Sequence, residues 1–323
     1  MFPSSLWAPS RRAFLVLALS LTAGLLQASA QQPAKPATLT LPPTNANVHY
    51  GPHERNVLDF WKADTKEPAP LVIFIHGGGF LAGDKSNVNV SAIESFLRSG
   101  ISFASISYRY TSQAPYPAPM LDGGRAVQFL RSKAAEWNID PKRVAAYGGS
   151  AGAGISLWLA FHDDLAKPDS TDPVERQSTR LTCAGSLGGQ SSYNPLTIRE
   201  WIGGRAWEHP ALVKLFGLNS TADFEKPENK QQFEDASAIT HLTRDDPPIV
   251  MYYNEPDEPL PPDAKPGQGI HHPKFGHILK EKMDALGIEC VYRHEKDGKQ
   301  PPGFVEVQQF LRDHLLGKAG KTP

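Results

Sequence analysis

The feature that most restricts the fold of this chain is a repeated alternation between short apolar runs and amphipathic segments. The run Leu71–Ile75 is apolar at every position, which is typical of a strand buried on both faces. The segment 121–137 spaces its apolar side chains by three and four residues, which predicts a helix with one core face. Strands that alternate with such helices predict an α/β fold with a mostly parallel sheet covered on both sides.

The same patterns predict the other elements and one interruption. We expect strands at 57–61, 71–75, 101–108, 144–147, 249–253 and 288–292, and helices at 91–97, 121–137, 151–165, 274–286 and 304–316. The alternation fails over 191–240, where Trp201, Trp207 and Phe216 stand among polar residues. We expect this stretch to be a small helical insertion or cap on one domain covering 48–318. Its aromatic residues either line a pocket or pack the cap itself.

The first thirty residues resemble an export signal. Two arginines precede the apolar run Ala13–Leu26, and Ala28-Ser29-Ala30 is a small-x-small pattern that signal peptidases accept. The run is short for a bilayer span, so an uncleaved anchor is the less favoured alternative. Sec and twin-arginine export both fit. We expect residues 1–30 to be a signal peptide and 31–47 a flexible tether. The mature chain is expected to be periplasmic or extracellular, without a membrane span.

Charge and cysteine content exclude several classes of protein. The chain has 33 basic and 34 acidic residues and a formal net charge of -1, so it lacks the excess charge typical of nucleic-acid binding. Two cysteines are too few for a disulfide scaffold or a four-cysteine zinc site. Export would allow Cys183 and Cys290 to pair, but both fall in strand-like segments, which favours buried free thiols. The sequence indicates no oligomeric state.

Two glycine-containing motifs each follow an expected strand. Gly148-Gly149-Ser150-Ala151-Gly152 matches G-x-S-x-G between a strand and a helix, where a sharp turn lifts the serine hydroxyl above the sheet. His76-Gly77-Gly78-Gly79 exposes bare backbone amides, which can stabilise an oxyanion. Its spacing fits neither the dinucleotide-binding nor the Walker pattern. Both motifs lie at carboxyl ends of strands, where parallel sheets carry their chemistry.

These motifs resemble those of the hormone-sensitive-lipase-like esterases of the α/β-hydrolase fold. Ser107-Tyr108-Arg109-Tyr110 and Asp140-Pro141-Lys142-Arg143-Val144 extend the resemblance, which covers about residues 48–316 and is lost through the insertion. It implies a serine carboxylesterase with Ser150 as nucleophile. It also implies oxyanion donors at the backbone amides of Gly78, Gly79 and Ala151, and no need for a cofactor or metal.

The acid of such a site follows the serine in the chain, and the histidine follows the acid. The loop after strand 249–253 carries four carboxylates, and three of them are candidates for the acid. Counting from Pro247-Pro248 places Asp257 where the family has its acid, with Glu255 and Asp263 as alternatives. The family usually carries Gly-His-Gly-Phe before its last helix, but this chain reads Pro301-Pro302-Gly303-Phe304.

Proline cannot transfer a proton, so Pro302 leaves the position of the base open. His294, at the end of the last strand, is the first candidate, and His271 or His272 ahead of helix 274–286 are the alternatives. We expect His277 and His314 to be surface or structural residues.

Two functions are consistent with a site in which the position of the base is open. One is an exported serine carboxylesterase acting on a small or polysaccharide-linked ester, and the other is a hydrolase-like binding module without turnover. His162-Asp163-Asp164 could imitate a metal cluster, but we interpret it as the polar end of a helix. His-Glu-x-x-His is not present in the sequence, which argues against a zinc protease.

Overall fold

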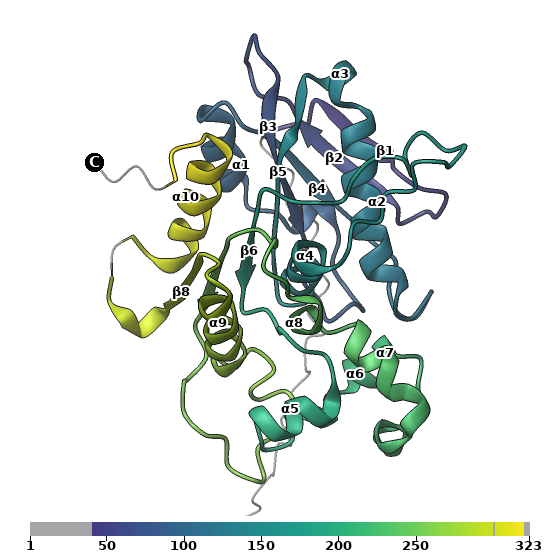
Figure 1. Cartoon of the computed structure of the whole chain (residues 1–323), viewed down its shortest axis with the longest axis vertical. Helices are drawn as coiled ribbons and strands as arrows, with labels where there is room; N and C mark the ends of the chain where they lie inside the picture. Colours follow the sequence, from purple (N-terminus) through teal and green to yellow (C-terminus); the bar gives the residue numbers. More distant parts are fainter. Residues whose placement is uncertain (1–40, 300, 320–323) are drawn as a thin grey trace, which may run out of the picture. The chain divides into compact units, whose positions relative to one another are not determined.

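Within the part of the chain that the structure describes, the sheet has eight strands in the order β1-β2-β4-β3-β5-β6-β7-β8 (Figure 1). The computed structural model describes residues 41–299 and 301–319, so the expected signal peptide lies outside the described residues. The strands are Asn45–His49, Val57–Trp61, Ala69–Ile75, Ser102–Ile106, Ile139–Gly149, Cys183–Leu187, Ile249–Tyr253 and Cys290–His294 for β1 to β8. The six strands β3 to β8 run parallel, and β1 and β2 complete one edge in antiparallel pairing. The expected α/β sheet is therefore present.

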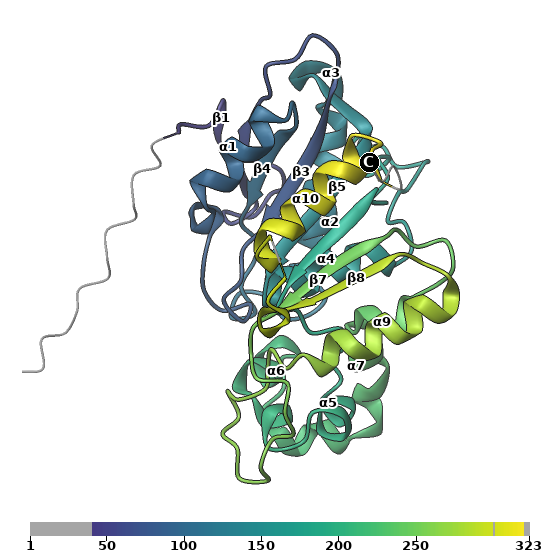
Figure 2. The ribbon, with the colours of Figure 1, turned by 90° about the vertical axis from the view of Figure 1, so that its left-hand side faces the viewer.

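Two hydrophobic clusters, one on each face, hold helices against the sheet. The larger helices are α1 (Val90–Arg98), α2 (Ala118–Ser132), α4 (Ala151–Phe161), α9 (Lys274–Leu286) and α10 (Gly303–Leu315). Leu71, Ile73 and Ile75 of β3 pack with α2, α4 and α9, whereas Val72 packs with α1 and α10. Figure 2 shows α1 and α10 lying over the same face of the strands. The continuous apolar run in β3 is thus explained by burial on both sides.

The segment between β6 and β7 forms short helices, in the region where we expect an insertion. These are α5 (Pro195–Trp201), α6 (Pro210–Leu215), α7 (Lys230–Asp235) and α8 (Ala238–His241), with 3-10 helices between α5 and α6 and between α6 and α7. Figure 1 shows α5, α6 and α7 beyond the ends toward which the parallel strands point. Since these are the carboxyl ends of the strands, the insertion lies beside the motifs that follow them.

Several expected boundaries shift by a few residues. Strand β1 begins at Asn45, inside the stretch 31–47 expected to be a tether, because it pairs with β2 and the Asn47 amide donates to Asp59 Oδ1 at 2.8 Å. The expected helix 121–137 is divided at Lys133 into α2 and α3 (Ala134–Trp137). Helix α4 ends at Phe161 rather than 165.

The two cysteines are buried and free. Strand β7 lies between the strands that carry Cys183 and Cys290, which places the two backbones about 10 Å apart. They also belong to clusters on opposite faces of the sheet. A disulfide is therefore excluded, and burial raises the pKa of the Cys290 thiol to about 12. Among the described residues, no helix is long and apolar enough to span a bilayer.

Candidate functional site

Ser150 stands at the turn between β5 and α4 in a strained backbone conformation. Its φ of 51° and ψ of -119° are rare for a residue with a side chain. The turn fits because its neighbours have no Cβ. A Cβ on Gly148 would lie 2.3 Å from the carbonyl oxygen of Ile75, and one on Gly152 would lie 2.0 Å from the same atom. The G-x-S-x-G spacing therefore follows from close contact between the turn and the end of β3.

The histidine against Ser150 is His271. Its Nε2 lies 2.8 Å from Ser150 Oγ, and its Nδ1 lies 3.0 Å from Glu255 Oε1. An ionised carboxylate only accepts hydrogen bonds, so Nδ1 carries the proton that it donates to Glu255. Nε2 is then left with a lone pair that can accept the serine proton. The structure thus joins a hydroxyl, an imidazole and a carboxylate in one hydrogen-bonded line.

Both partners of Ser150 come from the single loop that connects β7 to α9. Glu255 follows β7 directly, and His271 lies in the turns that precede α9. Gln190 Nε2 donates to the carbonyl oxygen of Ile270 at 2.5 Å and so anchors the chain beside His271. Burial opposes ionisation of Glu255, but hydrogen bonds and positive charge from His271 outweigh it and hold the pKa of Glu255 below its ordinary value. Glu255 is therefore ionised at neutral pH.

The residues that we favoured as acid and base lie elsewhere. Asp257 pairs with His277 Nε2 at 2.6 Å on the surface of α9, and Asp263 is exposed. His294 is buried and its Nε2 donates to the carbonyl oxygen of Glu255 at 2.8 Å. The structure therefore places the alternative His271 next to Ser150 and the alternative Glu255 next to His271, whereas His294 supports the backbone of Glu255.

His272, the other alternative, faces away from Ser150. Its Nε2 donates to the carbonyl oxygen of Glu258 at 2.9 Å, and its Nδ1 accepts from the amide of Lys274. Pro302 precedes α10 in the role of N-cap, and the nearby Phe304 lines the space beside Ser150. The imidazole against Ser150 therefore comes from the loop between β7 and α9 and not from a residue before α10.

The glycine loop after β3 lies against the serine turn. A Cβ on Gly77 would lie 2.7 Å from the carbonyl oxygen of Gly149, and Gly78 has a φ of 112° that strains any other residue. Gly79 and Ala151 line one pocket together with Ser150, whereas Gly78 is not among its lining residues. Among the described residues, the amides of Gly78 and Gly79 make no hydrogen bond to protein acceptors. Ala151 is the first residue of α4, where amides lack intrahelical partners.

His76 supports this loop, a role that its place in the glycine motif did not reveal. The ring is fully buried and stacks on Tyr108 with centroids 4.3 Å apart. Its Nδ1 donates to the carbonyl oxygen of Gly77 at 2.7 Å. Burial lowers the pKa of His76 to about 4, so the ring is neutral and fixes the loop without adding charge.

Two spaces of different size open on either side of Ser150. The smaller is about 50 Å³ and its apolar wall comes mainly from Phe80, Tyr193, Ile198, Leu212, Leu215 and Phe275. The larger is about 540 Å³ and is lined by Phe74, Gly77, Leu187, Tyr252, His271 and Phe304. We call them the narrow pocket and the wide groove.

The three aromatic residues singled out in the insertion do not line either space. Phe216 packs against Tyr116 and Phe233, and Trp207 packs against Phe224. Trp201 belongs to a separate hollow beside α9. Of the two alternatives for these residues, packing of the cap is the one observed. The insertion contributes Ile198 of α5 and Leu212 and Leu215 of α6 to the narrow pocket, and these aliphatic residues have no distinctive sequence signal.

The chain is similar in sequence to several known proteins. The family model BD-FAE matches residues 58–265. The chain is 25% identical over 221 residues to the probable carboxylic ester hydrolase LipM of Mycobacterium tuberculosis, covering 67% of this chain and 49% of that protein. It is 24% identical over 279 residues to the probable isoprenylcysteine alpha-carbonyl methylesterase ICMEL1 of Arabidopsis thaliana, covering 85% and 53%. The chain thus spans about half the length of the curated relatives it matches.

Solved structures show the same architecture. A truncated carbohydrate esterase from gut microbiota aligns with a TM-score of 0.64 and 22% identity, covering 87% of this chain and 99% of that one. An acetyl ester-xyloside bifunctional hydrolase from Caldicellulosiruptor lactoaceticus aligns with a TM-score of 0.62 and 20% identity, covering 82% and 89%. At this identity the likeness establishes the fold, and the expectation of an α/β-hydrolase is confirmed.

Proposed function

Because the chain belongs to the BD-FAE family, we propose that it is a serine carboxylesterase that works through an acyl-enzyme and acts after export from the cytoplasm. The observation that carries the proposal is the line of hydrogen bonds from Ser150 through His271 to Glu255, at 2.8 and 3.0 Å. The names of the relatives, a carboxylic ester hydrolase and a methylesterase, support ester hydrolysis. The expected signal sequence supports export.

In the first half-reaction, Ser150 Oγ attacks the ester carbonyl while His271 Nε2 takes the hydroxyl proton. The carbonyl oxygen becomes an oxyanion that accepts hydrogen bonds from backbone amides of Gly79 and Ala151, with Gly78 as the third expected donor. Each such donor contributes roughly 3 kcal/mol in the transition state. Glu255 stabilises the imidazolium and holds its tautomer. His271 then returns the proton to the leaving alcohol, and the acyl group stays on Ser150.

In the second half-reaction, water replaces the alcohol. His271 Nε2 takes a proton from water, the resulting hydroxide attacks the acyl carbon, and the same amides hold the second oxyanion. Collapse of this intermediate breaks the bond to Ser150 Oγ, which recovers its proton from His271. The products are a carboxylic acid and the regenerated enzyme, and the cycle requires no other reactant.

The two spaces beside Ser150 suggest the substrate class. The narrow pocket, at about 50 Å³, has room only for a short acyl chain. The wide groove, at about 540 Å³, accommodates a bulky alcohol beside aromatic surfaces of Tyr252 and Phe304. We therefore propose short acyl esters of large alcohols, a class that includes acylated polysaccharides.

The test is hydrolysis of p-nitrophenyl esters with acyl chains of increasing length by wild type, Ser150→Ala and His271→Ala. We expect turnover of the shortest esters, a steep decline with chain length, and a loss of at least 10³-fold in kcat for each variant. His277→Gln is the control, because its imidazole pairs with Asp257 on the surface. Wild type without turnover on any ester would support the binding-module hypothesis instead.

A further inference from the structure

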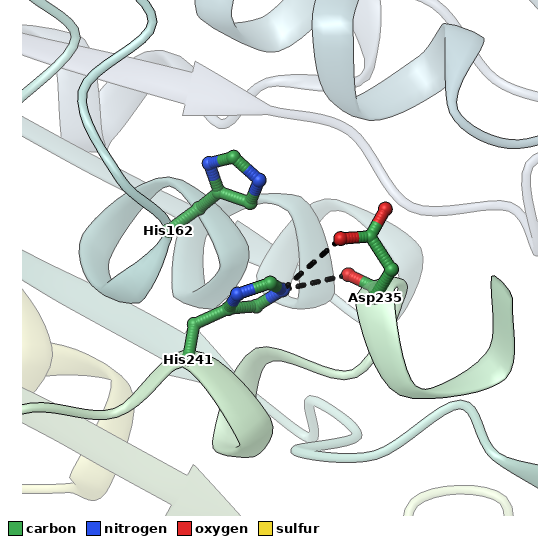
Figure 3. Close-up of side chains that lie close together, drawn as sticks. All are labelled: His162, Asp235 and His241. Carbon is green, nitrogen blue, oxygen red and sulfur yellow. Dashed lines mark hydrogen bonds and ion pairs between the residues drawn. The ribbon is translucent and has the colours of Figure 1, made fainter. Parts of the chain in front are cut away.

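A cluster of two histidines and an aspartate lies outside the proposed catalytic site. His162 caps the C-terminus of α4, Asp235 is the last residue of α7, and His241 is the last residue of α8. One ligating atom from each lies within 4.8 Å of the other two. Figure 3 shows the three side chains converging from separate segments, with His241 nearest to Asp235. The sequence pattern singled out only His162, as part of His162-Asp163-Asp164, because Asp235 and His241 lie more than 70 residues further along the chain.

The side chains are held in place by a second set of contacts. Tyr116 Oη donates to Asp235 Oδ2 at 2.5 Å, and Trp158 Nε1 donates to the carbonyl oxygen of Asp235 at 3.0 Å. The ring of Trp158 also lies against His162, with centroids 4.0 Å apart. Such outer contacts orient ligands and are typical of metal centres. The carboxylate is thereby left with Oδ1 directed toward His241.

The imidazoles present nitrogen atoms suited to ligation. Nδ1 of His162 donates to the carbonyl oxygen of Asp163 at 2.9 Å, which leaves Nε2 with a free lone pair. Nε2 of His241 lies 2.8 Å from the carbonyl oxygen and 3.9 Å from Oδ1 of Asp235. A cation between Nε2 of His241 and Oδ1 of Asp235 would replace the Nε2 proton and could also be bound by His162. The two rings already lie with centroids 4.6 Å apart.

We propose that His162, Asp235 and His241 bind one Zn²⁺ ion, with a solvent molecule as fourth ligand. Two imidazoles and one carboxylate suit Zn²⁺ and disfavour Ca²⁺ and Mg²⁺, which take oxygen ligands. Each ligating atom needs to move inward by less than about 1 Å to reach zinc distances of roughly 2.0–2.2 Å. The outer contacts orient the side chains, and their positions at helix ends, partly or fully exposed, allow a shift of this size.

The ion is structural. Helix α4 has eleven residues and begins directly after Ser150, so its far end lies about 16 Å away along the axis. Zinc at that end connects the helix behind the nucleophile to the insertion through α7 and α8. Binding therefore raises thermal stability without entering the ester chemistry, and the inference holds whether or not the proposed esterase activity is found.

The test is a zinc titration of untagged, chelator-treated protein by calorimetry, with thermal unfolding measured alongside. We expect one Zn²⁺ per chain and a rise in Tm of roughly 5 °C at a free concentration 100 times Kd. His162→Gln, Asp235→Asn and His241→Gln should each weaken binding at least tenfold. The matched control is His277→Gln, which removes an imidazole paired to a single carboxylate and should bind zinc like wild type.

A second measurement does not depend on any variant folding. Co²⁺ added to wild type should give the visible absorption of a tetrahedral centre, and Zn²⁺ should displace it. The proposal is overturned if the titration of wild type shows no saturable binding of Zn²⁺. It is also overturned if the Kd for Zn²⁺ is the same in wild type and the three variants. A Co²⁺ spectrum identical to that of the free ion overturns it as well.

Discussion

Replacing Glu255 with glutamine should identify the acid of the site. Glutamine keeps the size of the side chain but offers an amide that can donate to His271 Nδ1. The imidazole would then carry its proton on Nε2, facing Ser150 Oγ, and could no longer accept the serine proton. The charge that stabilises the imidazolium is lost as well.

The expected loss follows from this geometry. The same exchange of carboxylate for amide in a serine-histidine-acid triad costs about 10⁴ in kcat, which corresponds to roughly 5 kcal/mol. The Glu255 side chain is 29% exposed, so solvent partly screens its charge and we expect a loss of about 10³- to 10⁴-fold. KM should change little, because Glu255 lines neither the narrow pocket nor the wide groove.

The assay is steady-state hydrolysis of p-nitrophenyl acetate, with Asp257→Asn as the matched control. That substitution removes an exposed pair with His277 and should leave kcat within about twofold of wild type. If Glu255→Gln keeps more than a third of wild-type kcat, or if Asp257→Asn loses as much as Glu255→Gln, the assignment of Glu255 is refuted.

Three further results are expected. Gly152→Ala should destabilise the fold by several kcal/mol in thermal unfolding, because its Cβ would lie 2.0 Å from the Ile75 carbonyl oxygen, whereas Gly267→Ala meets nothing within 4 Å and should be neutral. Since burial lowers the pKa of His76 to about 4, the unfolded chain binds a proton between about pH 6.5 and 4 that the folded chain does not bind. The free energy of unfolding in urea should therefore fall by about 2 kcal/mol from pH 7.5 to 5, and His76→Asn should remove this part of the pH dependence. His294→Gln, which weakens one buried hydrogen bond to the Glu255 carbonyl oxygen, should lower kcat by roughly tenfold, and a loss as large as that of His271→Ala would contradict its supporting role.

The fold and the serine turn of the site could be predicted from local sequence patterns. Continuous apolar runs and helical spacing placed the sheet and its main helices, since burial on two faces or one leaves a periodic record in the chain. The serine turn was also readable, because only glycine fits at 148 and 152 beside the end of β3. In each case the pattern is local in the sequence, although the contact that requires it, such as that of Gly148 and Gly152 with Ile75, is not.

The identities of the proposed acid and base depended on tertiary structure. Four polar residues are candidates by sequence order, namely Glu255, Asp257, His271 and His294. The spacing from Pro247-Pro248 favoured Asp257, and the place at the end of the last strand favoured His294. Only the path of the loop between β7 and α9 decides which side chains meet Ser150. The His162, Asp235 and His241 cluster was hidden for the same reason. A strand or helix is specified by its own residues, whereas a site assembled from loops is specified by where distant segments pack.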